Sequence, residues 1–320
     1  MADRKKASRP ADRGTITVDG HELVITNPDK PLWPEMGITK LIYLQKLIAL
    51  SPHLIRHCRN RYLTVIRWPH GIHGDFFYQK NAPEPRPPFV GTAVSGGIRY
   101  VHLDNLATLL WLANLGALEF HASFERIGSP EPPEWVIDLD PSREEDPRIM
   151  EAAAIVGDVL ASLGIASVPK TSGATGVQII VPLAPGHAFE QLRALGRFIG
   201  RFVCEKHPRL FTLERLKKDR GDRIYFDYLQ HWPGKTLAAP YTPRARVFAP
   251  VSAPLTWDEV RAGVRPQDFH LLNMERRLAE TGDLLEQTPP QRLDDVLAFI
   301  IGAKTKTGSG AGRRSGPPGR

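Results

Sequence analysis

The fold is decided by two stretches of the chain, which read EWVIDLD at residues 134–140 and ASVPKTSGATGVQIIV at residues 166–181. Their apolar and β-branched residues predict strands on both sides of the Gly-rich segment TSGATG, and apolar residues at helical spacing precede and follow it. An alternation of strands and helices in this order predicts an α+β module. The expected strands are 134–140, 166–171, 177–181 and 224–229, and the expected helices are about 146–163, 187–207, after Thr256 and after Pro290.

The residues before 134 predict a second region that also mixes helices and strands. Leu and Ile at helical spacing after a capping residue indicate helices, and clustered β-branched and aromatic residues indicate strands. The expected elements are a helix from Thr39 to Cys58 that is broken near Pro52, a strand at 61–68, a Pro-rich connection at 82–89, a strand at 98–103, and an apolar helix capped by Asp104 that runs to about Leu118.

The 320-residue chain carries a formal net charge of +7, but the excess is concentrated at its ends. Residues 1–14 hold +3 and residues 303–320 hold +5, so the part between them carries −1. We expect both ends to be disordered basic tails, which would add only non-specific attraction to nucleic acid. If the folded part binds nucleic acid, it must do so through a local basic patch.

The composition also excludes several classes of protein. No apolar run approaches the roughly 18 residues of a membrane helix, and the basic N-terminus lacks the apolar segment of a secretory signal. Cys58 and Cys204 lie far apart with no CxxC spacing, which argues against a zinc site and against a disulfide scaffold. We therefore expect a cytoplasmic protein with no membrane association.

Asp138 and Asp140 are the first candidates for chemistry. They lie two residues apart in a predicted strand, so both carboxylates project from one face while Leu139 packs into the core. Hard oxygen ligands without Cys or His favour Mg²⁺ or Mn²⁺, and Asp227 in the apolar strand at 224–229 could complete a two-metal site. The alternative, which the dipeptide spacing alone favours, is that the two acids only cap the next turn.

A phosphate-type turn and a basic pair follow these acids in the chain. The segment 171–176 supplies hydroxyls and backbone N–H groups that can hold phosphate, although any hairpin could use the same residues. Arg244 and Arg246 would face one way on an extended chain and suit a triphosphate, with Lys235 before them, but a solvated basic strand is an equal alternative. Taken together and in this order, these features suggest a nucleotidyltransferase.

Two groups of residues in the region before residue 134 suggest contacts with a DNA end. Lys30 and Lys40 lie around a turn and a helix start, where they could hold a terminal phosphate. Phe76 and Phe77 lie near Arg67 and could stack on a base. A serious alternative is that one of them packs in the core and the other only covers a loop. His121, at the end of the predicted helix, is by itself more typical of a structural histidine.

Nine segments in a fixed order carry a family resemblance. They are TNPDKPLWPEMGITK (26–40), RWPHGI (67–72), FFYQK (76–80), LEFH (118–121), VIDLDPS (136–142), KTSGATG (170–176), IYFDY (224–228), KTLAAPYTPRAR (235–246) and PLTWDEV (254–260). With them the chain resembles, over about residues 22–300, the polymerase domain of bacterial ligase D in the archaeo-eukaryotic primase superfamily. The resemblance implies a primase-polymerase fold, with an N-terminal α/β subregion at about 15–130 and, at about 131–302, a catalytic antiparallel sheet similar to an RNA-recognition motif and flanked by helices.

The resemblance also implies a role for each candidate residue. The catalytic and metal-binding acids would be Asp138, Asp140 and Asp227, holding two divalent ions, Mn²⁺ or Mg²⁺. The nucleotide-binding residues would be His121, Ser172, Gly173, Gln178, Lys235, Arg244 and Arg246. The DNA-binding residues would be Lys30 and Lys40 on the 5′-phosphate, Phe76 and Phe77 on the template, and Arg67 and Arg220.

One position departs from the family's phosphate motif, which usually ends in histidine where this chain has Gln178. Glutamine can donate a hydrogen bond to a phosphate oxygen but brings no positive charge. Thr175 also stands where many relatives carry lysine. We therefore expect weaker nucleotide binding than in relatives with the histidine, but not loss of activity, because the three acids are present.

The resemblance implies template-directed gap filling and end extension in non-homologous end joining, with a preference for ribonucleotides. The implied partners are DNA gaps or broken ends bearing a 5′-phosphate, NTP or dNTP, Ku and a separate ATP-dependent DNA ligase, which would place the protein at the nucleoid. One alternative is a non-catalytic module that binds DNA ends. A D-x-D glycosyltransferase is a second alternative, against which the primase-like order of the motifs argues.

Overall fold

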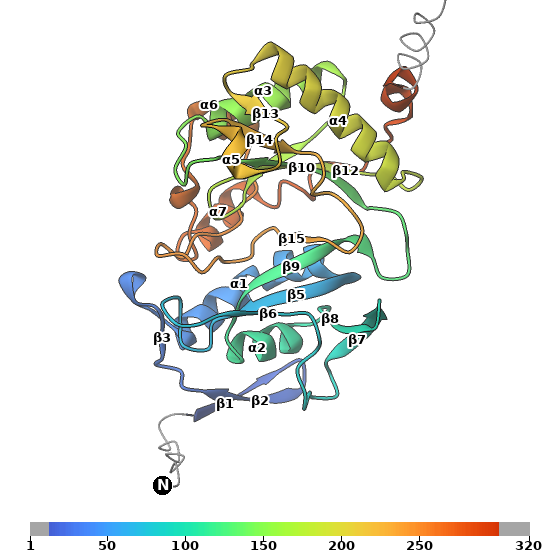
Figure 1. Cartoon of the computed structure of the whole chain (residues 1–320). Coiled ribbons are helices and arrows are strands. Elements are labelled where there is room, and N and C mark those ends of the chain that lie inside the picture. The colour runs from blue at the N-terminus through green and yellow to red at the C-terminus, as the bar shows by residue number, and fades with distance from the viewer. Residues whose placement is uncertain (1–12, 301–320) are drawn as a thin grey trace, which may run out of the picture.

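The computed structural model describes residues 13–300 and shows two main sheets, each with its own helices (Figure 1). The basic tails expected at 1–14 and 303–320 lie outside the described residues, except for Arg13 and Gly14, which begin strand β1 (Arg13–Val18). Buried apolar side chains from both sheets join in one continuous core. Among residues 13–300, no helix combines the length and the apolar character needed to cross a membrane.

The first sheet has five strands, and all its pairings are antiparallel except the one between its last two strands. In spatial order the strands are β11 (Val168–Thr171), β12 (Val177–Pro182), β10 (Glu134–Asp140), β14 (Ile224–Asp227) and β13 (Phe211–Thr212). Helices α3 (Ile149–Ser162) and α4 (Phe189–Lys206) lie over one face of this sheet (Figure 1). This arrangement confirms the expected α+β fold with a mainly antiparallel sheet flanked by helices.

Glycines on α4 bring this helix close to the sheet and so fix which side chains face it. A Cβ atom at Gly200 would lie 2.9 Å from the ring of Phe226 in β14, and one at Gly196 would lie 3.5 Å from Trp135 in β10. Because side chains alternate along a strand, Asp138 on β10 and Asp227 on β14 project from the opposite face. The sheet therefore presents its acids on the side away from the helices.

The second sheet faces the acid-bearing side of the first. Its strands are β15 (Thr236–Ala238), β9 (Ala117–Arg126), β5 (Arg61–Arg67), β8 (Ile98–His102) and β7 (Gly91–Ser95), with β6 (Phe77–Gln79) also paired to β5. Helices α1 (Lys40–Cys58) and α2 (Leu106–Asn114) pack against each other and against β9. The chain brings β15 to this sheet from the far side of the boundary expected near residue 130, so the two regions are interleaved.

Shorter elements complete the described part of the chain. β1 pairs with β2 (His21–Thr26), and β3 (Pro31–Trp33) pairs with β4 (Ile38–Thr39) just before α1. The remaining elements are the 3₁₀ turns η2 (Pro34–Met36) and η3 (Pro266–Asp268), the helices α5 (Lys217–Arg220), α6 (Trp257–Ala262) and α7 (Met274–Thr281), and a helical stretch at 294–300.

The helix expected from Asp104 to about Leu118 is wrong at both ends. Asn105, whose side chain accepts from the Thr108 N–H, is the N-cap of α2, and the helix ends at Asn114. Gly116 then adopts φ +88° in close contact with Pro69, and the chain continues as β9. Since a continuous apolar run fits a buried helix or a buried strand equally well, hydrophobicity alone could not find this turn. His121 therefore lies inside a strand.

The expected break near Pro52 is also absent, because α1 runs through it. A proline has no N–H to donate to the carbonyl four residues earlier, here that of Ile48. The hydroxyl of Ser51 donates to that same carbonyl oxygen at 2.8 Å. The lost backbone hydrogen bond is thus replaced locally, and the helix stays continuous.

Candidate active site

The three predicted acids meet on neighbouring strands of the first sheet. Asp138 on β10 lies directly opposite Asp227 on β14, and Asp140 lies opposite Tyr225. Asp138 is buried, whereas Asp140 and Asp227 are partly exposed. The carboxylate of Asp227 accepts hydrogen bonds from the Tyr225 hydroxyl at 3.0 Å and the Leu229 N–H at 2.9 Å, which orient it. The sequence prediction that these acids share one face is confirmed.

The pKa values of two of these acids reflect their burial and the repulsion between neighbouring carboxylates. Burial raises the pKa of Asp138 well above its ordinary value, and the charges of Asp140 and Asp227 add to this effect. Burial and Asp227 likewise raise the pKa of Asp140, although Arg220 and Lys217 oppose them. Like charges held this close favour protonation of one member of the group. A cation bound between these carboxylates would remove their repulsion.

The residues fit a hard divalent cation by their chemistry. Carboxylate oxygens, with no Cys or His beside them, are the ligands that Mg²⁺ and Mn²⁺ prefer. Within residues 13–300, no three Asp, Glu, His or Cys side chains are already closed into a metal-binding group. The carboxylates of Asp138, Asp140 and Asp227 are therefore neighbours whose mutual repulsion a cation would relieve. That they bind a cation remains a prediction.

Lys170 is a site residue that sequence analysis missed. It lies on β11 and is fully buried, and its ammonium donates to the Gln178 side chain, to the Ser252 hydroxyl at 2.6 Å and to the Ala238 carbonyl at 3.1 Å. Burial and the charge of Arg244 lower the pKa of Lys170 to about 7. Gln178, expected on the nucleotide, is itself buried, and it stands opposite Lys170 on one side and Asp138 on the other.

The turn after β11 is built around the hydroxyl of Ser172. This oxygen accepts from the N–H groups of Ala174 at 3.1 Å and Gly176 at 3.0 Å, which closes the segment into a compact loop. Gly173 adopts φ +67°, and a Cβ atom there would lie 2.6 Å from the side chain of Arg244. The guanidinium of Arg244 in turn donates to the Ser172 carbonyl. Loop and arginine are therefore packed together, and phosphate binding by them stays a prediction.

Gly176 allows this loop to approach strand β10 between Asp138 and Asp140, and its replacement tests how closely the loop and the strand are packed. A Cβ atom at Gly176 would lie 2.5 Å from the backbone carbonyl oxygen of Leu139, between Asp138 and Asp140. We expect Gly176→Ala to lower the free energy of unfolding by about 1–3 kcal/mol, as overpacking does. Gly14→Ala, with no atom within 4 Å, is the matched control. Equal unfolding temperatures of the two variants would show that β10 can move aside with no loss of stability.

Glu119 joins two of the predicted nucleotide contacts, and sequence analysis did not single it out. Its carboxylate lies 2.9 Å from His121 Nε2 and 2.9 Å from Arg244 Nε, and it accepts the Ala245 N–H at 3.0 Å. Burial raises the pKa of Glu119, but the His121 hydrogen bond and the charge of Arg244 outweigh it, so the pKa is lowered. Burial lowers the pKa of His121, which leaves its ring neutral at neutral pH.

The other two predicted basic contacts are held less firmly. Arg246 makes an exposed ion pair with Glu144 at 3.0 Å, and a pair of this kind contributes at most about 1 kcal/mol. Lys235 donates to the Leu229 carbonyl at 2.8 Å, two residues beyond Asp227. An anionic ligand could therefore recruit Arg246 at little cost.

The two lysines expected on the 5′-phosphate lie together beside β2 and α2. The ammonium of Lys40 is largely buried and donates to the carbonyls of Thr26 and Asn114, each at 2.8 Å. Lys30 is more exposed and donates to the Pro69 carbonyl at 3.0 Å. Burial and the charge of Lys30 lower the pKa of Lys40 to about 8. Protein oxygens thus already surround the Lys40 ammonium, and contact with a phosphate stays a prediction for both lysines.

The aromatic residues expected on the template are exposed. Phe76 is 54 % exposed and stacks on Trp68 with ring centroids 5.1 Å apart, and Phe77 is 44 % exposed beneath the guanidinium of Arg67 at 5.0 Å. Neither phenylalanine lies in the core, so the part of the structural alternative that placed one of them there is wrong. Arg220 differs from its expected place on the surface: it is buried, and its guanidinium lies 4.1 Å from the ring of Tyr225.

Comparison with known proteins identifies relatives of this arrangement. The family model described as "LigD, primase-polymerase domain" matches residues 39–285. The LigD protein of Bacillus subtilis strain 168, a bifunctional non-homologous end joining protein, is 39 % identical over 263 residues, which are 82 % of this chain and 43 % of that protein. The multifunctional LigD protein of Mycolicibacterium smegmatis is 31 % identical over 82 % of this chain and 35 % of its own length. The chain thus spans less than half of each relative.

A solved structure shows the same fold. The polymerase domain of Mycobacterium tuberculosis ligase D, in complex with DNA, superposes with a TM-score of 0.77 at 29 % identity. The match covers 83 % of this chain and 97 % of that domain. The similarity therefore extends over both sheets.

Proposed function

Because this chain belongs to the LigD primase-polymerase domain family, we propose that it is a template-directed nucleotidyltransferase that fills gaps and extends ends during non-homologous end joining. One observation carries the proposal. The acids Asp138, Asp140 and Asp227 lie together on the first sheet, and a phosphate-type loop bound to Arg244 lies beside them. Transfer of a nucleotide requires a cation-binding site of this kind next to a site that binds phosphate.

The proposed reaction joins a primer 3′-hydroxyl to the α-phosphate of an incoming nucleotide, with release of pyrophosphate. Two divalent cations, Mn²⁺ or Mg²⁺, would supply Lewis-acid activation of the hydroxyl and charge neutralisation on the pyrophosphate. The chain's own part is to hold these cations with its three acids and to hold the triphosphate with Ser172, Gly173, Arg244 and Arg246. No side chain needs to act as a general base.

The substrate side of the proposal rests on residues around β3, the start of α1 and strand β6. Lys30 and Lys40 would hold the 5′-phosphate across the gap, and Phe76 and Phe77 would stack on the template next to it. We propose ribonucleotides as the preferred substrate, and Ku and an ATP-dependent DNA ligase as partners, as in end joining. Two exposed phenylalanines beside a pair of lysines support a single-stranded template next to a phosphorylated end.

Primer extension on gapped DNA tests the proposal directly. The substrate is a short gap with a recessed 5′-phosphate, incubated with Mn²⁺ or Mg²⁺ and with either NTPs or dNTPs. Templated addition of nucleotides, faster with NTPs, is the expected result. Binding of the DNA end without any extension would contradict the proposal and support a non-catalytic end-binding module instead.

Recognition of the 5′-phosphate should weaken as the pH rises above about 8. The pKa of Lys40 is about 8, so its ammonium is present below that pH and lost above it, while the phosphate stays a dianion throughout. The measurement is the ratio of dissociation constants for DNA with a 5′-hydroxyl and with a 5′-phosphate, taken at pH 7 and at pH 9.5. We expect this ratio to fall by about tenfold, the effect of losing one charge-assisted contact.

Replacements on α1 separate this effect from a general loss of charge. Lys40→Met should give a low ratio at both pH values, whereas Lys46→Met, which removes an exposed lysine paired with Glu275 on the same helix, should behave like wild type. A wild-type ratio that stays constant between the two pH values would show that Lys40 does not contact the phosphate.

A further inference from the structure

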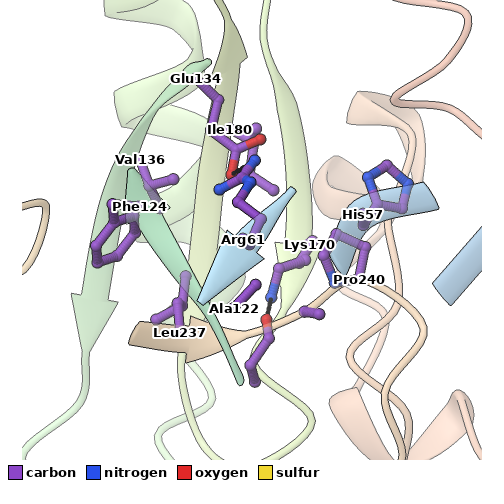
Figure 2. A pocket seen from close by; sticks show the side chains of 12 residues that line it. His57, Arg61, Ala122, Phe124, Glu134, Val136, Lys170, Ile180, Leu237 and Pro240 are labelled. Atoms are coloured by element: carbon purple, nitrogen blue, oxygen red, sulfur yellow. Dashed lines mark hydrogen bonds and ion pairs between the residues drawn. The ribbon is translucent and has the colours of Figure 1, made fainter. Parts of the chain in front are cut away.

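The fully buried Lys170 lies between the two sheets, at the wall of a small internal cavity. Figure 2 shows Lys170 facing the cavity together with the ion pair of Arg61 and Glu134, which joins the two sheets at 3.0 Å. The cavity has a volume of about 20 Å³, which is no larger than one water molecule needs. The space beside Lys170 therefore admits no substrate, and the role of this lysine has to lie in its protein contacts.

The three contacts of Lys170 are all with acceptors. The Ser252 hydroxyl gives its own proton to the Thr171 carbonyl at 2.9 Å, so towards Lys170 it can only accept. The Ala238 carbonyl and the Gln178 side-chain oxygen are the other two partners. Three acceptors match the three N–H donors of an ammonium group. The lysine is thus fixed in one orientation by β11, β12 and the segments at residues 238 and 252.

This fixed lysine determines the orientation of the Gln178 amide. An ammonium group has no lone pair, so the side of Gln178 that faces Lys170 must be its carbonyl oxygen. The NH₂ group then points away from Lys170. In the register of the sheet, Gln178 lies opposite Lys170 on β11 and opposite Asp138 on β10, so its NH₂ group is available to the Asp138 carboxylate. The Gln178 amide also lowers the pKa of Asp138 against the effect of burial.

We propose that Lys170 and Gln178 are positioning residues that hold the Asp138 carboxylate in the orientation needed to bind a divalent cation. The proposal rests on the proposed function, in which Asp138 is a ligand of that cation. A neutral amide donor orients the carboxylate without cancelling its negative charge. The positive charge of Lys170 stays one residue further away, where it cannot displace the cation. The role of Gln178 is thereby different from direct contact with the triphosphate.

Direct measurement of Mn²⁺ binding tests the proposal without relying on turnover. Free Mn²⁺ is quantified by electron paramagnetic resonance during titration of wild type, Lys170→Met, Gln178→Met and the double variant. Loss of a partner that orients a metal ligand usually weakens metal binding by about 10- to 100-fold, and we expect this for each single variant. Since Lys170 would act on Asp138 only through the Gln178 amide, the double variant should be little worse than either single one.

A control and a kinetic readout distinguish positioning from a general loss of structure. Lys206→Met makes the same chemical change at an exposed lysine on α4 and should leave Mn²⁺ binding as in wild type. In gap filling, Gln178→Met should raise the Mn²⁺ concentration for half-maximal rate, while the nucleotide KM at saturating Mn²⁺ stays near the wild-type value. If Lys170→Met does not fold, as judged by thermal unfolding, Gln178→Met alone decides.

Two results would overturn the proposal. One is an unchanged Mn²⁺ dissociation constant in folded Gln178→Met, and the other is a higher nucleotide KM in that variant with Mn²⁺ binding intact, which would put Gln178 on the triphosphate. If wild type binds Mn²⁺ but extends no primer, the proposed function is contradicted. The positioning role would still be supported by the Mn²⁺ titrations of the wild type and its three variants. Active wild type with unaltered Mn²⁺ binding in both single variants would contradict only the positioning role.

Discussion

Gap filling by the Asp138→Asn variant is expected to fall by about a thousandfold or more, while binding to a 5′-phosphorylated DNA end persists. The substitution keeps the size of the side chain but removes the anionic oxygen that faces Asp227 across β10 and β14. Divalent cations contribute several kcal/mol to the stabilisation of developing charge in such reactions, and about 4 kcal/mol corresponds to a thousandfold change in rate. In the proposed function the DNA end is held by Lys30, just before β3, and Lys40, at the start of α1, both away from the acids, so its affinity should stay unchanged.

The stability of the same variant gives a second, independent readout. Because burial and neighbouring acids raise the pKa of Asp138 in the folded protein, its ionised form costs stability at neutral pH, and that cost disappears as pH falls through the raised value. Asparagine carries no charge, so Asp138→Asn should unfold at the same temperature as wild type or higher. Asp158→Asn, at an exposed aspartate paired with Arg261, is the matched control and should keep wild-type activity. A wild-type rate of gap filling by Asp138→Asn would contradict the assignment of the three acids as metal ligands.

Glu119→Gln is expected to raise the nucleotide KM by about 10- to 100-fold. The carboxylate of Glu119 serves His121, Arg244 and the Ala245 N–H at the same time, whereas an amide has one acceptor oxygen and turns its NH₂ group towards donors. A hydrogen bond to a charged group, such as that between His121 and the Glu119 carboxylate, is worth about 1.5–3 kcal/mol, which corresponds to this range in affinity, and the ion pair with Arg244 is lost as well. Arg244 would lose the partner that aims it at the phosphate loop.

The readout for Glu119 is the division between KM and kcat in primer extension. At saturating nucleotide the three acids are untouched, so kcat should fall much less than kcat/KM. Glu205→Gln, at an exposed glutamate on α4, is the control for the loss of a carboxylate and should behave like wild type. A normal nucleotide KM in folded Glu119→Gln would mean that Arg244 and His121 hold their places without it.

The sequence predicts the first sheet well because its strands carry strong local signals. EWVIDLD and VQIIV are rich in β-branched residues, a Gly-rich turn directly precedes VQIIV, and both lie in strands of the structure. The stretch from Leu106 to Phe120 lacked such a signal, because α2 and the start of β9 are both mainly apolar and only Leu115 and Gly116 lie between them. The continuity of α1 past Pro52 depended on a hydroxyl contact within one turn, which no periodicity reveals.

For the site, residues in recognisable motifs were found and their supporting partners were not. The acids and the Ser172 loop carry local patterns of their own. Glu119 and Lys170 are single charged residues inside apolar strands, and their partners Arg244 and Ser252 lie more than 80 positions away in the chain. Which side chains meet across strands depends on sheet register, and register follows from the packing of the whole core. A charge placed in a predicted buried strand is the one signal that could have drawn attention to both.

Strand β15 limits how this protein can be dissected. The chain lays residues 236–238 on the edge of β9 beside His121 and then continues directly to the loop of Arg244 and Arg246. A fragment that ends near residue 130 would leave the N–H and C=O groups of that edge uncovered, and exposed edges of this kind recruit strands from other chains. The complementary fragment would carry a three-residue strand with no sheet to join. Expressing the halves separately should therefore yield aggregation rather than two working parts, and point substitutions in the intact chain are the way to assign their roles.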